Sequence, residues 1–273
     1  MNNKIKTLGL NLLLLAIAIV TLAPFVWMVS ASFMPNGEAF VFPPKFLPDT
    51  FSLTQYEKLF TRINIGRFFL NSFILSVSVT FISLFFNSMA GFVFAKYKFA
   101  GKDKLFKLLL SSMIIPAQVT MLPLFLMLKE MGFINTYLAI IIPGMANIFG
   151  IFLIKQYAES IPDSLIEAAK IDGASDFQIY YKIFLPVIKP ILVTLALFTF
   201  MGTWNDFIWP LIALSDQSMF TLPVALANLM GEHSQDPELM MAGSTLTILP
   251  IIIVFLVLQK QYIKGIMLGS VKE

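Results

Sequence analysis

The sequence has no cysteine and a single histidine, which limits the chemistry open to the protein. Without cysteine there are no disulfide scaffolds, thiolate metal sites, thioether-linked haems or cysteine nucleophiles. Charge is also scarce, because 13% of the 273 residues are charged while 58% are hydrophobic, and the mean hydropathy is +0.82. A soluble domain carries about 25% charged residues. The composition therefore indicates an integral membrane protein.

Six apolar windows contain no charged side chain. A helix rises 1.5 Å per residue, so about 20 apolar residues cross the hydrocarbon core. The fifth window is long enough only if it continues past Asp206, which must then lie near a membrane surface. Windows of this length predict helices, because backbone in lipid must satisfy its own hydrogen bonds. We therefore predict an all-α, polytopic membrane helical bundle with six transmembrane helices. The windows run over Thr7–Gly37, Phe68–Ala95, Leu108–Leu128, Met131–Ile154, Pro190–Asn205 and Leu239–Gln259.

Lysine and arginine distribution predicts the orientation of these helices. An even number of spans puts both termini on one side, and that side receives 14 of the 19 basic residues, against five on the other. By the positive-inside rule both termini are cytoplasmic. The chain also lacks any run of more than two basic residues, so its net charge of +3 does not indicate nucleic-acid binding. Gly91, Gly144 and Gly150 suit close packing between the helices.

Three parts of the chain follow from this topology. Residues 1–67 hold the first transmembrane helix and an external loop, Phe33–Arg67, whose prolines between Phe42 and Pro48 predict an extended segment. That loop is either a plain connector or a docking site for a partner. Residues 68–264 hold the other five helices, and residues 265–273 form a cytoplasmic tail. A second external loop, Ala213–Glu238, holds His233 beside two carboxylates, which we interpret as a solvated loop rather than a metal site.

The internal loop 155–189 is too long and too amphipathic to be a simple turn. Ser160 with Asp163 matches a capping box, and an apolar pattern follows up to Gly173, a natural residue for ending a helix. Ser175 with Gln178 matches a second box, and an aromatic pattern follows until Pro186 ends it. The sequence therefore predicts a helix-turn-helix on the cytoplasmic surface.

This element has three interpretations: a helix resting on lipid, part of an intramembrane active site, or a helix that docks in a groove of another protein. Its acidic residues argue against anionic lipid headgroups. The small Ala168-Ala169 patch beside Glu167 favours the third interpretation, because small residues let a partner backbone approach and a carboxylate can fix the register against an arginine.

The spacing of these residues resembles a known motif. Glu167-Ala168-Ala169, then Gly173 four positions on, then Ile183 to Pro186 after nine further residues, match the EAA motif of the membrane subunits of bacterial ABC importers at every defined position. The whole chain resembles the maltose-type carbohydrate-uptake permeases, specifically the shorter of two permease subunits. Supporting segments are Phe42–Pro48, Asn71-Ser72, Ile115-Pro116, Ile161-Pro162, Ile171–Ala174, Thr203–Phe207, Pro210-Leu211 and Gln259–Gly265.

This resemblance implies a permease that carries a mono-, di- or oligosaccharide across the bacterial cytoplasmic membrane. In this family the EAA loop is a coupling helix that docks on a cytoplasmic ATPase. Glu167 would pair with a basic residue of the ATPase cleft, Ala168 and Ala169 would form the close-packed face, and Gly173 would allow the turn. The coupling residues that the motif implies are Glu167, Ala168, Ala169, Asp172, Gly173, Ile183, Leu185 and Pro186.

The partners follow from the same resemblance: a homologous second permease, a dimer of ATPase subunits and an extracytoplasmic solute-binding protein. The chain contains no G-x-x-x-x-G-K-[ST] sequence, so ATP and Mg²⁺ are expected on the ATPase and no cofactor on this chain.

Trp204, Asn205 and Asp206 are candidates for the solute path, because aromatic faces, amides and carboxylates recognise neutral sugars. A tryptophan of the aromatic belt with an interfacial aspartate explains the same residues equally well. Two other function classes make different demands on the sequence. An ion-coupled secondary transporter needs ionisable groups at mid-membrane, and none of the six windows has one away from its ends. A membrane-embedded protease or transferase is not indicated, because the sequence has no H-E-x-x-H or G-x-S-x-G motif.

Overall fold

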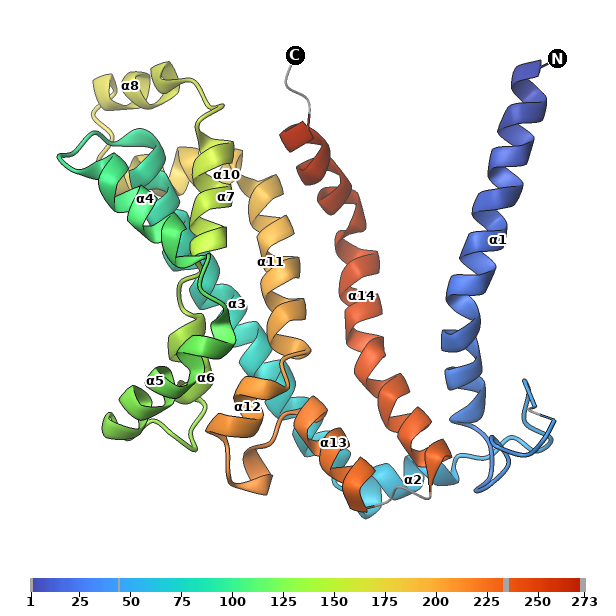
Figure 1. The fold of residues 1–273 in the computed structure, drawn as a ribbon. Coiled ribbons are helices and arrows are strands. Elements are labelled where there is room, and N and C mark those ends of the chain that lie inside the picture. The colour runs from blue at the N-terminus through green and yellow to red at the C-terminus, as the bar shows by residue number, and fades with distance from the viewer. Residues whose placement is uncertain (1, 44, 233–235, 271–273) are drawn as a thin grey trace. The chain divides into compact units, whose positions relative to one another are not determined.

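The structure is a computed structural model that describes residues 2–43, 45–232 and 236–270. Every regular element in that part of the chain is helical, which confirms the all-α prediction. The α-helices are α1 (Asn2–Ala31), α2 (Thr54–Thr61), α3 (Ile65–Lys96), α4 (Lys102–Ser112), α5 (Ala117–Glu130), α6 (Leu138–Gly144), α7 (Ile148–Ala158), α8 (Asp163–Ile171), α9 (Asp176–Ile179), α10 (Leu185–Val187), α11 (Lys189–Trp204), α12 (Ile208–Ala213), α13 (Leu222–Glu232) and α14 (Pro237–Ser270). A π-helix, η1, spans Tyr180–Phe184, and a 3₁₀ turn, η2, spans Gln217–Met219 (Figure 1).

One of the six predicted spans, Leu108–Leu128, is bent, and the chain bends again just before the fifth predicted span, Pro190–Asn205. Helices α4 and α5 meet at 101° across Met113–Pro116, and the segment Asp176–Val187 meets α11 at 78°. Pro116 explains the first bend, because proline lacks an N–H group and disfavours helical backbone at the residue before it. Four helical segments are long and apolar enough to cross a membrane without such a bend, and there are up to six if each bent pair is one span. The number six therefore stays a prediction.

Both loops that were predicted to be external contain helices that were not predicted. Helix α2 lies within Phe33–Arg67, and α13 occupies much of the region 213–238 that was expected to be a solvated loop. The described residues of the proline-rich segment, 42–43 and 45–48, lie between α1 and α2 and belong to no helix. His233 lies outside the described residues.

The chain forms two compact units, residues 1–67 with 225–250, and residues 68–224 with 251–273. In the first unit, polar contacts hold the connecting segments. Lys58 pairs with Asp236 at 2.9 Å, the Ala39 N–H group donates to Glu238 at 2.8 Å, and the Trp27 indole donates to the Lys45 carbonyl at 3.1 Å. The proline-rich segment is therefore anchored to the end of α1 by a side chain of that helix.

In the second unit, glycines allow α3 to pack closely against α6 and α7. A Cβ atom on Gly91 would lie 2.5 Å from the Ile154 Cγ2 atom, and one on Gly144 would lie 2.7 Å from the Val79 Cγ1 atom. At Gly150 the added atom would overlap the side-chain amide of Asn87. The predicted role of these three glycines is confirmed, because only hydrogen fits at each contact.

Candidate functional site

Helix α8 is a short, well-terminated helix. It begins after Pro162, and the predicted capping box at Ser160 is wrong, because the Ser160 hydroxyl donates to the Tyr157 carbonyl at 2.7 Å instead. It ends in a Schellman motif. Gly173 has a φ of 79°, its N–H group donates to the Lys170 carbonyl at 3.0 Å, and the next N–H group reaches the Ala169 carbonyl at 2.9 Å. The predicted role of Gly173 at the end of this helix is confirmed.

The second half of the element begins as the sequence predicts. Ser175 and Gln178 form a capping box in which each side chain binds the other residue's backbone N–H group, at 3.3 and 2.9 Å. The prediction that Pro186 ends this helix is wrong. Pro186 lies in the first turn of α10, after the π-helical stretch, and the chain bends at Ile188.

The burial of the motif residues separates two faces of α8. Glu167, Ala168, Asp172 and Gly173 are exposed, whereas Ala169 is only 6% exposed. The expectation that Ala169 forms part of a partner-facing surface is therefore corrected. Residues on successive helix positions point about 100° apart, and the buried Ile166 places Ala169 on the inner face. Of the remaining motif residues, Ile183 and Leu185 are half-buried and Pro186 is exposed.

Several large side chains of the predicted apolar and aromatic patterns are exposed. Ile171 is 86% exposed and Leu165 is 41% exposed, both on α8. The aromatic pattern of the following segment also divides, since Tyr180 and Phe184 are buried while Phe177 and Tyr181 are exposed. Exposed apolar side chains beside an exposed carboxylate are a composition that suits contact with another protein.

The inner face of α8–η1 joins a continuous hydrophobic core. Ile166 and Ala169 belong to one cluster with Phe92 of α3, Ala158 of α7 and Ile191 of α11. The Tyr180 hydroxyl is also 2.6 Å from the Ser88 hydroxyl of α3. The element is therefore packed onto three apolar helices of its own unit rather than attached to them only by its ends.

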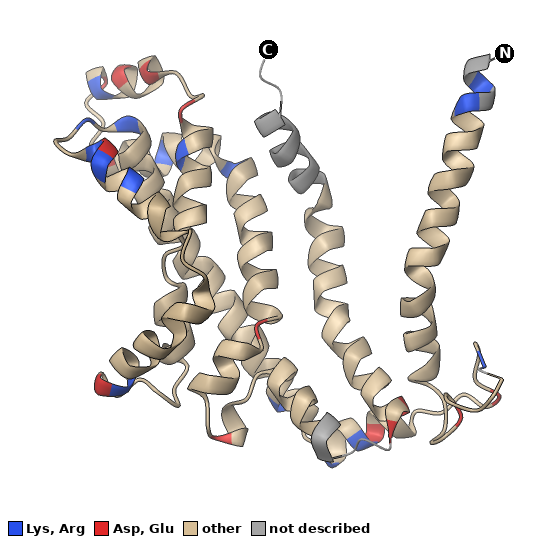
Figure 2. Cartoon of the chain, viewed as in Figure 1, with Lys and Arg blue, Asp and Glu red and all other residues tan. Residues whose placement is uncertain are grey.

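Charged side chains surround this element. The Lys96 ammonium donates a hydrogen bond to Asp163 at 2.7 Å and lowers the pKa of that carboxyl below its usual range. Burial raises the pKa of Tyr97, and the neighbouring Asp176 carboxylate raises it further, to about 12. Figure 2 shows that lysines gather near α4 and α8.

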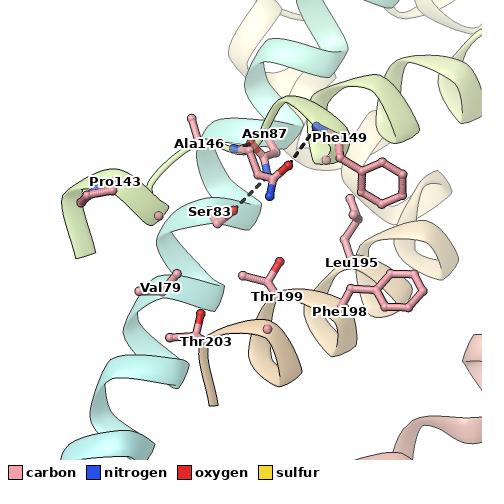
Figure 3. A pocket seen from close by; sticks show the side chains of 14 residues that line it. Val79, Ser83, Asn87, Pro143, Ala146, Phe149, Leu195, Phe198, Thr199 and Thr203 are labelled. Carbon is pink, nitrogen blue, oxygen red and sulfur yellow. Dashed lines mark hydrogen bonds between the residues drawn. The ribbon is translucent and has the colours of Figure 1, made fainter. Parts of the chain in front are cut away.

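A first cavity, of about 230 Å³, lies where α6 breaks from α7, opposite α3 and α11 (Figure 3). Its polar lining includes Ser83, Asn87, Asn147, Thr199 and Thr203. Asn87 is held in place, because its Nδ2 group donates to the Ser83 hydroxyl at 2.9 Å and its Oδ1 atom accepts the Asn147 N–H group at 2.9 Å. The lining is thus largely apolar, its polar groups are hydroxyls and amides, and none of its residues is charged.

A second cavity, of about 640 Å³, lies where the start of α5 meets the break between α11 and α12. Asn205 and Asp206 line it together with Gln118 and Thr120, and Pro143 lines both cavities. The expectation for Trp204 is corrected. Its side chain is fully buried between Phe69 and Phe200, at ring distances of 5.3 and 5.7 Å, so it offers no free aromatic face.

Residues 87–267 match the family described as the binding-protein-dependent transport system inner membrane component. The chain belongs to this family. It is 36% identical to the arabinooligosaccharides transport system permease protein AraQ of Halalkalibacterium halodurans, over 94% of this chain and 93% of the relative. It is 32% identical to the melibiose/raffinose/stachyose import permease protein MelC of Bacillus subtilis, over 98% of both chains.

A solved structure agrees with this assignment. A chain from the crystal structure of a bacterial ABC transporter involved in the import of the acidic polysaccharide alginate matches with a TM-score of 0.85 and 25% identity, over 95% of this chain and 97% of that chain. The protein is thus a multi-pass inner-membrane permease of an ABC importer, a transport component and not an enzyme. The matched range includes all of α8, the α11 residues that line the first cavity, and all the residues that line the second cavity.

Proposed function

We propose that this permease translocates a sugar, and that α8 is its docking helix for a separate cytoplasmic ATPase. The observation that carries the proposal is the division of α8 into two faces. Glu167 and Ala168 are exposed beside apolar side chains, while Ile166 and Ala169 fasten the helix to the hydrophobic core of its unit. When a partner displaces such a helix from its outer face, the helices packed against its inner face move with it.

The remaining partners complete the transport system. A homologous second permease supplies the other half of the pathway, a dimer of ATPase subunits binds ATP and Mg²⁺, and an extracytoplasmic binding protein delivers the solute. The absence of a phosphate-binding loop from the sequence supports placing ATP on the partner. The lysines of α4 and Lys96 beside α8 support a cytoplasmic location for the docking element, and six spans would then put both termini on the same side.

The solute path runs through the two cavities. Thr199 and Thr203 of the first cavity are followed along the chain by Asn205 and Asp206 of the second, so hydroxyl, amide and carboxylate groups succeed one another. These groups match the hydroxyls of a neutral sugar. Relatives named for arabinooligosaccharides and for melibiose, raffinose and stachyose support an oligosaccharide as the solute.

Purification in mild detergent with the native partners tests the proposal. We expect the tagged chain to retain a second permease and an ATPase, and Glu167→Lys to weaken retention of the ATPase by more than about tenfold, because it brings a like charge to the basic cleft. Glu130→Lys is the matched control, since Glu130 is equally an exposed glutamate on a helix, α5, outside the coupling element. Equal retention in Glu167→Lys, Glu130→Lys and the wild type would exclude α8 as the docking helix.

A further inference from the structure

We propose that Lys96 and Tyr97, the two residues at the end of α3, hold α8 at both of its ends and make α3 move with it. The proposal rests on the proposed function, because it identifies the residues that transmit displacement of the docking helix. We call these two residues the α3 clasp. They act as positioning residues and contact neither solute nor nucleotide.

Lys96 holds the start of α8. Its side chain is only 3% exposed, and its ammonium group donates to the Ile161 carbonyl at 2.6 Å and to Asp163 at 2.7 Å. Ile161 is buried and Asp163 is the first residue of α8. An exposed ion pair alone contributes little, but a buried ammonium that loses its acceptors is strongly unfavourable. The arrangement therefore resists any separation of α3 from the start of α8.

Tyr97 holds the other end. The Lys170 ammonium from the last turn of α8 lies 5.2 Å from the centre of the Tyr97 ring, a cation–π distance. Lys170 also lies 4.0 Å from Asp176 at the start of α9. The Tyr97 ring packs in turn on Phe92 of α3, at a ring distance of 5.4 Å. Lys96, the last residue of α3, and Tyr97, which follows it, thus meet α8 at its first and its last turn.

The chain segments on either side of α8 transmit its movement less directly than the α3 clasp does. The chain enters α8 through a non-helical turn at Ser160–Pro162 and leaves the element through a π-helical stretch and a bend. In contrast, α3 runs unbroken for 32 residues and packs through Gly91 and Gly144 against α7 and α6. A displacement of α8 that reaches α3 therefore reaches Val79, Ser83 and Asn87, the α3 lining of the first cavity.

The first test measures solute transported per ATP hydrolysed by the complete complex in proteoliposomes. We expect Lys96→Met to keep the ATPase subunit and its hydrolysis but to lower this ratio about tenfold, and Lys96→Arg to restore most of it. Lys155→Met is the matched control. Lys155 is also largely buried, at 16% exposure, but its ammonium group pairs with Glu159 near the end of its own helix and lies 4.6 Å from the centre of the Phe106 ring of α4. A ratio in Lys96→Met equal to that of Lys155→Met would overturn the clasp.

A second test does not depend on transport. The chain has no cysteine, so spin labels can be placed at Ser164→Cys on α8 and Val93→Cys on α3, both exposed positions. We expect one narrow distance distribution that is the same with and without ATP, and a broadened or shifted one in Lys96→Met. A distribution in the wild type that changes with ATP, or one that Lys96→Met leaves narrow, would overturn the proposal.

The two tests separate the two proposals. If the wild-type complex shows no ATP-driven uptake, the proposed function fails while the label distances still test the clasp in the full chain. If the wild type couples ATP to uptake and Lys96→Met behaves as the control does, the clasp alone fails. If Lys96→Met no longer retains the ATPase, the distances between the labels on α8 and α3 in the variant chain still show whether Lys96 holds the two helices together.

Discussion

The phenol of Tyr97 lies among apolar side chains at the end of α3, near the Asp176 carboxylate. Both surroundings oppose its ionisation and raise its pKa to about 12, against about 10 for a free tyrosine. A group with a raised pKa in the folded state stabilises the fold below the unfolded value, and this contribution disappears as the pH rises from about 10 to about 12. Phenylalanine keeps the ring that lies near Lys170 and packs on Phe92, and removes only the ionisable hydroxyl.

We expect Tyr97→Phe to remove this alkaline loss of stability, which amounts to about 1 kcal/mol at pH 11. The measurement is the thermal unfolding midpoint in detergent at pH 8, 9, 10 and 11, and the prediction concerns the difference between variant and wild type across this range. Tyr181→Phe, at an exposed tyrosine of the same element, is the control. Parallel curves for the wild type and Tyr97→Phe would contradict the assignment of this pH dependence to Tyr97.

Single residues also show where the sequence alone stops being informative. The spacing of the motif predicted the exposed Glu167 and the turn at Gly173, because a helix end and a charged face leave local signals. It could not separate Ala168 from Ala169, since which of two adjacent alanines is buried depends on where Phe92 and Ile166 lie. Trp204 posed the same problem, because its burial depends on Phe69, which is 135 residues away in the chain.

At the scale of elements, the contact between α3 and α7 depends on glycine. An alanine at Gly91 would place its Cβ atom 2.5 Å from Ile154 Cγ2 and 2.8 Å from Ile154 Cβ, which forces the two helices apart. We expect Gly91→Ala to destabilise the protein by about 1–3 kcal/mol, the usual cost of an overpacked contact.

Gly202→Ala is the matched control for this prediction. Gly202 lies in α11 with no atom within 4 Å of an added Cβ, so alanine there should stabilise the helix by about 0.5–1 kcal/mol. The measurement is the midpoint of thermal unfolding for both variants in the same detergent. A loss of stability in both variants, or in neither, would refute the close contact between Gly91 and Ile154.

The elements themselves were predicted unevenly. Long apolar windows identified the helices, and the second capping box located the start of α9. The bend at Met113–Pro116 was not predicted, because the absence of charged residues from a window does not tell whether the helix axis changes direction within it. Helix α13 was missed because Ala213–Glu238 was read from its few charged residues, whereas its apolar residues from Leu222 to Leu229 are mostly buried.

On the scale of the whole molecule, the distribution of charge bears on what drives transport. Figure 2 shows the charged residues at helix ends and in connecting segments. None of the residues that line the first cavity is charged, and the second cavity has Asp206 as its one charged lining residue. An ion-coupled transporter needs ionisable groups within its path to bind and release the driving ion. This permease instead presents an exposed helix, α8, through which an external ATPase can act.

We therefore expect uptake to depend on ATP and not on an ion gradient. In proteoliposomes that hold the permease, its second permease, the ATPase and the binding protein, removal of ATP should abolish uptake. A protonophore together with a sodium ionophore should leave the initial rate within about twofold of its starting value, because the free energy of transport comes from closure of the ATPase on ATP. Vesicles with the permease alone are the control. Uptake into those vesicles under an imposed proton or sodium gradient would show that the chain is an ion-coupled carrier, with Asp206 as the first residue to substitute.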